Sequence, residues 1–364
     1  MKTILHVIDT TGPGGAETIF IQLAKKMADN GHHSLALIRG NGWVQSQLEK
    51  YNIPFIVLDC KGSFNFKYLL EIAKIVKSKN ISIIQSHLLG SNVYCSIVGL
   101  LTGTRVISTF HGEVDISPTE NFRLIKLLAI QLGSSKVITV TDRLTKMVKS
   151  LPLISASKVL TIYNGIELEQ YGKINTSSFR DTLNIHPNEI LIGSLGNIRS
   201  PKNYPLAIRT IKSIHEKGQK VHYVVAGEGN EKQMQPLLDL TNELKLKKYI
   251  HFLGFTKKTQ EFLSSLDIFL MSSSSEGHPL ALTQAMVNGL AIASTKSGVE
   301  LIVSNNEEAI LSTEMTPESL SQAIQTLIET PELAKKISAN AKLKALKHFN
   351  LDTMFQNYLK IYNI

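Results

Sequence analysis

Residues 4–17 read ILHVIDTTGPGGAE, an apolar run followed by a glycine-rich turn and the start of a helical pattern. The run Ile4–Ile8 predicts a buried strand, and apolar residues at helical spacing over Ala16–Asn30 predict the helix that follows. A strand, a turn and a helix in this order form the opening unit of a parallel sheet covered by helices.

The same alternation continues through the first half of the chain. Short runs rich in Val and Ile predict further strands at 34–38, 55–58, 82–85, 106–109, 137–140 and 159–162. Helical stretches separate most of these runs. The pattern indicates an α/β domain with a parallel sheet that carries helices on both faces.

A polar segment, Asn164–Asn188, interrupts the alternation and predicts a linker. A second series of predicted strands follows at 190–195, 221–226, 250–253, 268–271, 291–294 and 309–311. Predicted helices close the chain at 317–329, 331–347 and 351–362. Because the second series repeats the first, we expect two similar domains in tandem.

The composition agrees with a globular protein of two domains. The chain has 364 residues, of which 43% are hydrophobic and 19% charged, which excludes a disordered class. The formal charge of +9 favours anionic partners, although a solvated basic surface explains it equally well. Two cysteines, Cys60 and Cys95, argue against a disulfide framework. No run reaches the roughly 18 apolar residues of a membrane span, so we expect a soluble or peripheral protein.

In sheets of this kind, ligands bind at the loops that follow the carboxyl ends of the strands. In the first half, Gly14 and Gly15 open the first helix, where glycine lets the backbone approach a ligand and free N–H groups attract anions. His111 follows a predicted strand and is succeeded by Gly112, and His87 stands in a similar place. A tight turn, or a histidine that caps a carbonyl group, is the structural alternative.

Two loops of the second half carry the same kind of signal. The loop Gly196–Asn203 holds Arg199 and Lys202, which suit a diphosphate, although exposed cations are common. The segment Ser272–Leu280 combines a serine run with Glu276 and places Pro279 where a first helical turn is expected. The N–H groups of the following residues then remain free for phosphate oxygens. A serine-rich turn that caps a helix is the alternative for this segment.

The sequence lacks the motifs of several other chemistries. It has no Asp-x-Asp pair and no His-Glu-x-x-His, so we expect no metal site and no cofactor. A hydrolase elbow around a serine nucleophile is missing as well. No aromatic platform or recognition motif accompanies the positive charge, so we expect no nucleic-acid partner.

Taken in order from Gly14 to Leu301, these pieces resemble the retaining glycosyltransferases of family 4. The resemblance implies the GT-B fold, in which two Rossmann-like domains with parallel sheets face each other across a cleft. It further implies domains at 1–170 and 171–349, with a C-terminal helix near 350–364 returning to the first. A metal-independent transfer of sugar from a nucleotide-sugar to an acceptor is the implied activity.

The resemblance also assigns roles to residues. Gly14 and Gly15 would lie against the donor diphosphate and the acceptor, and His111 would contact the donor sugar. Arg199 and Lys202 would neutralise the diphosphate, and Glu276 would bind sugar hydroxyls. The other residues implied in donor binding are Gly196, Asn197, Gly227, Gly254, Phe255, Gly277, His278, Pro279, Leu280, Ala281 and Gln284. We expect His111, Glu276, Lys202 and Arg199 to act in catalysis.

Two positions depart from the family pattern. Gln284 stands where members have the glutamate that accepts hydrogen bonds from the ribose, and Asn197 stands where many have arginine. These departures motivate one alternative, a non-catalytic nucleotide-sugar-binding homologue. A nucleotide-sugar 2-epimerase of the same fold is a second alternative.

By analogy with the family, we expect a UDP-linked hexose or N-acetylhexosamine as donor and a glycan or lipid-linked acceptor. A role in surface polysaccharide or lipopolysaccharide biosynthesis follows from the same analogy. The segment Asn121–Leu132 mixes Arg123 and Lys126 with large apolar residues, which suits either an interfacial helix or a buried helix with two surface cations. We therefore expect a cytoplasmic protein with peripheral contact to an anionic membrane.

Overall fold

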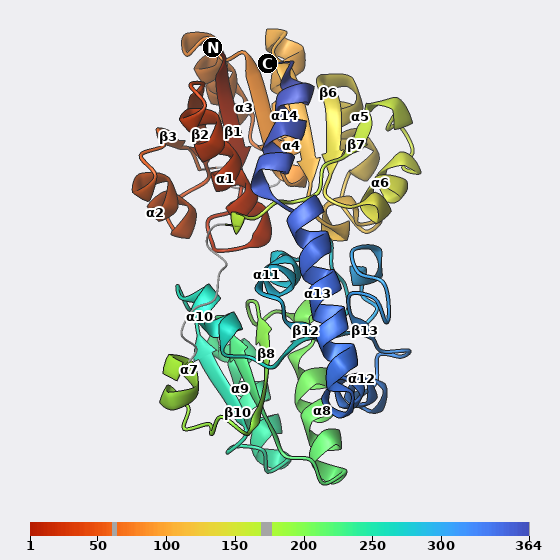
Figure 1. Ribbon diagram of the computed structural model, residues 1–364. Helices are drawn as coiled ribbons and strands as arrows, with labels where there is room; N and C mark the ends of the chain where they lie inside the picture. Colours follow the sequence, from red (N-terminus) through yellow and green to blue (C-terminus); the bar gives the residue numbers. More distant parts are fainter. Residues whose placement is uncertain (60–63, 169–176, 364) are drawn as a thin grey trace. The chain divides into compact units, whose positions relative to one another are not determined.

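The computed structural model describes residues 1–59, 64–168 and 177–363 of the chain. Contacts divide the chain into two compact units (Figure 1). Unit 1 contains Met1–Gly165 and Asp352–Ile364, and unit 2 contains Ile166–Leu351. Each unit is built around one parallel sheet with its own hydrophobic core.

The sheet of unit 1 has seven strands in the order β3-β2-β1-β4-β5-β6-β7, and every pair is parallel. Its strands are β1 (Thr3–Ile8), β2 (His33–Ile38), β3 (Phe55–Val57), β4 (Ile83–His87), β5 (Arg105–Phe110), β6 (Ser134–Thr139) and β7 (Val159–Thr161). The helices are α1 (Gly15–Asp29), α2 (Trp43–Lys50), α3 (Phe66–Ser78), α4 (Leu89–Thr102), α5 (Arg123–Gly133), α6 (Asp142–Lys149) and α14 (Leu351–Tyr362).

Both faces of this sheet are buried, as β1 illustrates. Leu5 and Val7 pack in a cluster with residues of α3 and α4, whereas Ile8 packs in another cluster with residues of α1 and α2. Successive side chains of a strand point to opposite faces, so a strand covered on both sides must be apolar at nearly every position. This requirement explains the unbroken apolar run that opens the sequence.

Helix α14 belongs to unit 1 although it lies at the far end of the chain. Tyr358 and Tyr362 are almost fully buried, and the Tyr362 hydroxyl donates to Gln85 Oε1 on β4 at 2.9 Å. The guanidinium of Arg105 donates to the last carbonyl groups of the helix, those of Ile361 and Tyr362. Side chains of unit 1 therefore hold both the face and the C-terminus of α14.

Unit 2 repeats the plan with a six-stranded parallel sheet in the order β10-β9-β8-β11-β12-β13. Its strands are β8 (Ile190–Leu195), β9 (Val221–Ala226), β10 (Ile250–Gly254), β11 (Ile268–Met271), β12 (Ala291–Ser294) and β13 (Ile310–Leu311). Its helices are α7 (Ser177–Thr182), α8 (Tyr204–Glu216), α9 (Glu231–Glu243), α10 (Thr259–Ser264), α11 (Leu280–Asn288), α12 (Pro317–Glu329) and α13 (Pro331–His348).

The structure confirms the predicted α/β class and each predicted strand, with ends that differ by up to three residues. The predicted linker needs correction, because α7 forms within Asn164–Asn188. Arg180 of that helix donates to the carbonyl group of Ser265 and pairs with Asp267 at 2.6 Å, contacts that ordinary linker residues lack. Part of the predicted linker, residues 169–176, lies outside the described residues.

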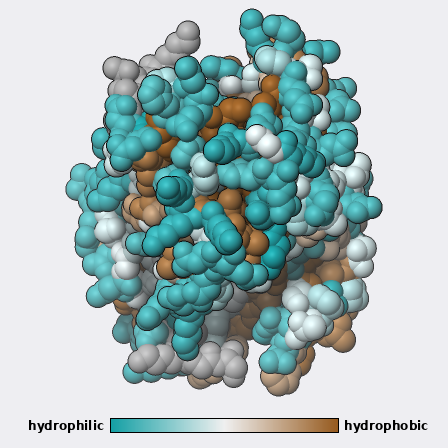
Figure 2. Space-filling view, turned by 90° about the horizontal axis from the view of Figure 1, so that it is seen from below, coloured by the Kyte–Doolittle hydropathy of each residue, from teal (hydrophilic) through white to brown (hydrophobic). Residues whose placement is uncertain are grey.

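The length and the apolar character of a helix decide whether it could cross a bilayer. None of the helices in the described ranges combines the length and the apolar character that a bilayer crossing requires. On the face shown in Figure 2, hydrophilic side chains cover most of the surface and apolar side chains show between them.

Candidate functional site

The predicted site residues lie in both units, and each group is described within its own unit. In unit 2, the strands β8 and β11 are neighbours, so the loops at their carboxyl ends lie side by side. The first loop holds Lys202, and the second holds the serine run (Ser272–Ser275) and Glu276. Adjacent parallel strands thus bring together residues that are far apart in the sequence.

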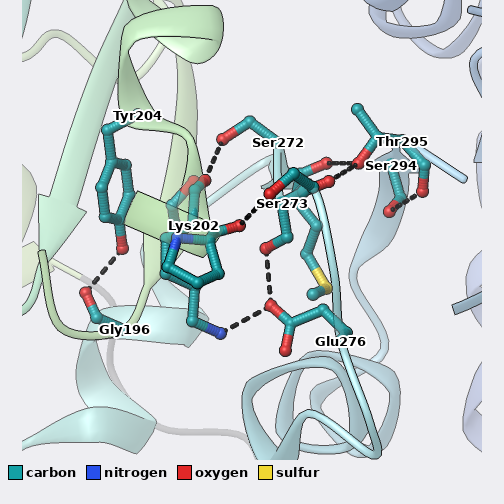
Figure 3. Close-up of polar contacts among 12 residues, drawn as sticks. Gly196, Lys202, Tyr204, Ser272, Ser273, Glu276, Ser294 and Thr295 are labelled. Carbon is teal, nitrogen blue, oxygen red and sulfur yellow. Dashed lines mark hydrogen bonds and ion pairs between the residues drawn. The ribbon is translucent and has the colours of Figure 1, made fainter. Parts of the chain in front are cut away.

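Lys202 and Glu276 form an ion pair at the centre of this group. Lys202 Nζ lies 2.7 Å from Oε1 of Glu276, and their side chains are 25% and 10% exposed. Ser273 Oγ donates to the same oxygen at 2.5 Å. Figure 3 shows both bonds meeting at one carboxylate oxygen, with no bond drawn to the other. Among the described residues, Oε2 of Glu276 has no hydrogen-bond partner and can accept a hydrogen bond.

The serine run also ties the two loops together through the backbone. Ser272 Oγ donates to the carbonyl group of Lys202 at 2.8 Å, and Ser274 N donates to that of Pro201 at 2.8 Å. From the next strand, Thr295 Oγ1 donates to the carbonyl group of Ser273 (Figure 3). Helix α11 has Pro279 as its N-cap without a side-chain cap bond. The serine-cap alternative for this segment is therefore wrong.

Gly196 and Gly227 meet where β8 and β9 end. A Cβ atom at Gly227 would lie 1.9 Å from the carbonyl oxygen of Gly196, so a larger residue at Gly227 would have to push this backbone away. Tyr204, which is buried, donates from its hydroxyl to the same carbonyl oxygen (Figure 3). Gly227 N in turn donates to Gly254 at 2.8 Å. These contacts place three of the predicted glycines next to one another.

The start of α11 offers backbone donors to an anion. The helix begins at Leu280, so Pro279 precedes the first turn instead of occupying it as predicted. The N–H groups of Leu280 and Ala281 have no hydrogen-bond partner among the described residues. Unpaired N–H groups at a helix N-terminus bind phosphate oxygens well.

The remaining predicted residues of unit 2 fall into two classes. Arg199 is exposed without an ion pair in the described ranges, Phe255 is 42% exposed, and Gln284 is partly exposed. His278, by contrast, is buried, with its Nε2 3.0 Å from Thr283 Oγ1 and its ring against Phe349. The imidazole of His278 therefore packs inside unit 2. The structure brings Lys202 and Glu276 together in space, and the start of α11 follows Glu276 closely along the chain. His278, by contrast, packs in the interior of unit 2.

In unit 1, the glycine-rich turn leads directly into α1. Gly14 is the N-cap of the helix in an extended conformation, and the Glu17 carboxylate bends back toward it. Asp9, at the end of β1, accepts a hydrogen bond from Ser91 N in the first turn of α4. Burial raises the pKa of Asp9, and Arg39 partly opposes this rise.

His111 lies at the end of β5 as predicted, and His87 at the end of β4 is its neighbour. The His87 Nδ1 and His111 Nε2 atoms are 2.9 Å apart. The loop around His111 is fixed by Asp115, whose Oδ2 accepts from His111 N at 2.7 Å and from Gly112 N at 3.3 Å. The other oxygen of Asp115 accepts from Leu89 N, which begins α4.

Sequence reasoning missed Ser273, Asp115 and Tyr204, which act on predicted residues through hydrogen bonds. For Ser273 and Asp115, position was an available signal, because each lies within four residues of a predicted site residue. Burial raises the pKa of Asp115 to about 6, against the hydrogen bonds it accepts. No group of three potential metal-ligating side chains occurs in the described part of the chain.

Comparison with family models covers both units. The model of glycosyl transferases group 1 matches residues 175–344, and the model of glycosyltransferase family 4 matches residues 13–170. The O-antigen biosynthesis glycosyltransferase WclY of Escherichia coli is 31% identical over 205 residues. That match covers 55% of this chain and 54% of the relative, so the chain spans about half of that relative's length.

Other relatives match over more of their length. The capsular polysaccharide biosynthesis glycosyltransferase CapH of Staphylococcus aureus is 24% identical over 344 residues, covering 90% of this chain and 91% of the relative. An Escherichia coli enzyme named UDP-Gal:alpha-D-GlcNAc-diphosphoundecaprenol alpha-1,3-galactosyltransferase is 22% identical, covering 85% of this chain and 82% of the relative.

Among solved structures, HepE of Anabaena in complex with UDP and glucose has a TM-score of 0.88 at 21% identity, covering the whole of both chains. This likeness concerns the fold. Two parallel-sheet domains, matched in order by the two family models, are the architecture that the sequence resemblance implied. The chain therefore belongs to the group 1 glycosyltransferases, with a family 4 first half and the GT-B fold.

Proposed function

We propose that the chain is a metal-independent, retaining glycosyltransferase that moves a hexose or N-acetylhexosamine from a UDP-linked donor to a glycan or lipid-linked acceptor. Surface polysaccharide biosynthesis is the proposed setting. The observation that carries the proposal is the Lys202–Glu276 pair, which leaves Glu276 Oε2 open beside a cation. One group suits a phosphate and the other suits sugar hydroxyls, as a nucleotide-sugar requires.

In this proposal, unit 2 holds the donor. Lys202, Arg199 and the N–H groups that open α11 bind the diphosphate, and Glu276 Oε2 accepts from sugar hydroxyls. As the bond between sugar and phosphate breaks, negative charge grows on the leaving phosphate, where these donors stabilise it. The acceptor oxygen then bonds to the anomeric carbon on the face that the phosphate leaves, and the leaving phosphate takes the acceptor proton, so the configuration is retained. For His111 of unit 1, we propose only the catalytic role that the family resemblance implies.

The names of the relatives support the donor and acceptor classes. HepE binds UDP and glucose, and the galactosyltransferase of Escherichia coli is named for a UDP-linked donor and a diphosphoundecaprenol acceptor. The non-catalytic homologue stays as an alternative, since Gln284 lacks the charge of the family's glutamate, and the 2-epimerase stays as an alternative of the same fold.

Calorimetric titration in EDTA tests the donor site. UDP, GDP and their sugars are titrated into the wild type and into Glu276→Ala. We expect one nucleotide family to bind, with the preference for the sugar conjugate lost in the variant. Absence of nucleotide binding would overturn the proposal. Transfer to an added acceptor then separates a transferase from an epimerase, which releases free epimer or glycal instead.

We further propose that α5 contacts an anionic membrane surface. All four exposed positions of this helix are apolar, namely Leu124, Ile125, Leu128 and Leu132, and Phe122 just before it is 74% exposed. This exposed face contradicts the buried-helix alternative. Cations accompany it in the same unit, since Lys146 and Lys149 on α6 are exposed without ion pairs in the described ranges. An apolar face with nearby cations suits anionic lipid.

Vesicle co-sedimentation tests this contact. We expect the protein to bind vesicles of phosphatidylglycerol more strongly than vesicles of phosphatidylcholine, and Ile125→Glu to reduce binding. Leu343→Glu on α13 is the matched control, because Leu343 is 66% exposed and Ile125 is 67% exposed. Equal binding by the two variants would show that α5 has no special role.

A further inference from the structure

Two histidine rings meet where β4 and β5 end. His87 is the last residue of β4 and is fully buried, and His111 directly follows β5. Their ring centroids are 5.1 Å apart with an interplanar angle of 24°, and Nδ1 of His87 lies 2.9 Å from Nε2 of His111. Such a short contact between two ring nitrogens requires one hydrogen atom between them.

Both rings are neutral near pH 7. Burial lowers the pKa of His111 from its ordinary value of 6.5 to about 3. The pKa of His87 is also well below 6.5, because of burial and because His111 and His6 are close. Asp115, in the loop after His111, binds backbone N–H groups. A neutral imidazole carries a hydrogen on one nitrogen and a lone pair on the other.

The contact therefore couples the two tautomers. If His87 Nδ1 carries the shared hydrogen, His111 Nε2 is bare, and the hydrogen of His111 must be on Nδ1. If His111 Nε2 carries it, His87 Nδ1 is bare, and the hydrogen of His87 must be on Nε2. Any mixed arrangement would place two hydrogens or two lone pairs between nitrogens only 2.9 Å apart.

We infer that His87 and His111 form a coupled neutral pair, in which both rings carry the hydrogen on Nδ1 or both carry it on Nε2. His87 is thus a positioning residue that decides whether His111 Nδ1 is a donor or an acceptor. The His111 Nδ1 and His87 Nε2 atoms are both buried, and neither has a hydrogen-bond partner among the described residues. The pair can offer either a hydrogen-bond donor or an acceptor to a hydroxyl group, and the net charge of the two rings stays zero.

The consequence for the donor rests on the proposed function, whereas the coupling does not. A sugar hydroxyl that accepts from His111 Nδ1 selects the state with both hydrogens on Nδ1. A hydroxyl that donates to it selects the state with both on Nε2. When the pair passes from the first state to the second, the shared hydrogen moves from His87 Nδ1 to His111 Nε2, His111 Nδ1 releases one hydrogen, and His87 Nε2 takes one up.

NMR of protein with ¹⁵N-labelled histidine tests the inference at pH 7 without ligand. The Nδ1 and Nε2 shifts of each ring identify its tautomer. We expect His87 and His111 to show the same tautomer, or the same ratio of tautomers. A stable Nδ1–H form in one ring with a stable Nε2–H form in the other would overturn the inference.

Two variants and a ligand extend the measurement. His87→Phe keeps a ring but removes the bond, so the tautomer ratio of His111 should change. His215→Phe in unit 2, which removes a histidine whose Nε2 lies 2.9 Å from the carbonyl oxygen of Val221, should leave it unchanged. Added UDP-glucose should shift both rings together. If UDP-glucose does not bind at all, the proposed donor is wrong. The spectrum without ligand still shows whether the tautomers of His87 and His111 are coupled.

Discussion

Lys202 Nζ lies 2.7 Å from Oε1 of Glu276, so the two side chains proposed to hold different parts of the donor are bonded to each other in the free chain. Ser273 donates to the same oxygen and keeps the carboxylate oriented. These two contacts fix the Lys202 ammonium and the Glu276 carboxylate relative to each other. Preorganised charges cost no rearrangement when negative charge develops on a leaving group.

Replacing Lys202 by Ala should reduce kcat/KM on the order of 100-fold, because a cation that stabilises the leaving phosphate is lost. Steady-state transfer kinetics with the donor identified by titration measure this effect. Lys212→Ala is the control, since Lys212 belongs to a surface pair with Glu216 on α8. Near-wild-type turnover by the Lys202 variant would remove the phosphate assignment.

Replacing Ser273 by Ala should weaken nucleotide-sugar binding about 10-fold, as expected for the loss of one hydrogen bond to a charged group. Binding of the free nucleotide should change little, because Ser273 acts on Glu276, which is proposed to bind the sugar and not the nucleotide. Calorimetry with both ligands separates the two effects. Ser274→Ala is the neighbouring control, and equal losses for both ligands would indicate a general disturbance of the loop.

Replacing Tyr362 by Phe should lower the unfolding free energy of unit 1 by about 1–2 kcal/mol, because Gln85 Oε1 loses a buried partner. Trp43 is the only tryptophan of the chain and lies in α2 of unit 1, so its fluorescence during urea unfolding reports on this unit. Tyr249→Phe in unit 2 is the control, and it should leave the urea unfolding transition of Trp43 fluorescence unchanged. An unchanged transition in the Tyr362 variant would contradict the role given to this bond.

Unit 1 should become less stable as the pH falls below 6.5. The pKa values of His6, His87 and His111 are lowered by burial, to about 3 for His6 and His111. Below 6.5 the unfolded chain binds protons that the folded chain excludes, which costs up to about 1.4 kcal/mol per histidine and pH unit. Asp115, whose pKa is raised to about 6, and Asp9, whose pKa is also raised, act in the opposite direction, but the three histidines outnumber them. Urea unfolding followed by Trp43 fluorescence at pH 7.5 and at pH 5.5 measures the difference in unfolding free energy. A higher unfolding free energy at pH 5.5 would contradict the expectation.

Much of the fold follows from local pattern. The strands were predictable because a strand buried on both faces leaves an unbroken apolar run such as Ile4–Ile8, bounded by turn residues. Helix α7 was missed because its sequence, SSFRDT, is short and polar, and because distant groups such as Asp267 hold it. Such tertiary contacts leave no periodic signal in the sequence.

For the site, the sequence indicated residue types and loops but not bonds. Lys202 and Glu276 were predicted separately, since nothing in their spacing states that they share an ion pair. The serine run was ambiguous, because serine suits both a helix cap and a bridge between loops. The order of the strands decided between these, since β11 lies next to β8 and brings the run to Pro201 and Lys202.

The return of α14 to unit 1 has a consequence for synthesis on the ribosome. Tyr362 is bonded to a residue 277 positions earlier, and all of unit 2 is encoded between them. During translation, β4 and β5 must therefore wait for their last covering helix until the second domain has emerged. Unit 1 is expected to reach its native state after unit 2, and chaperones would meet it first as an incomplete domain.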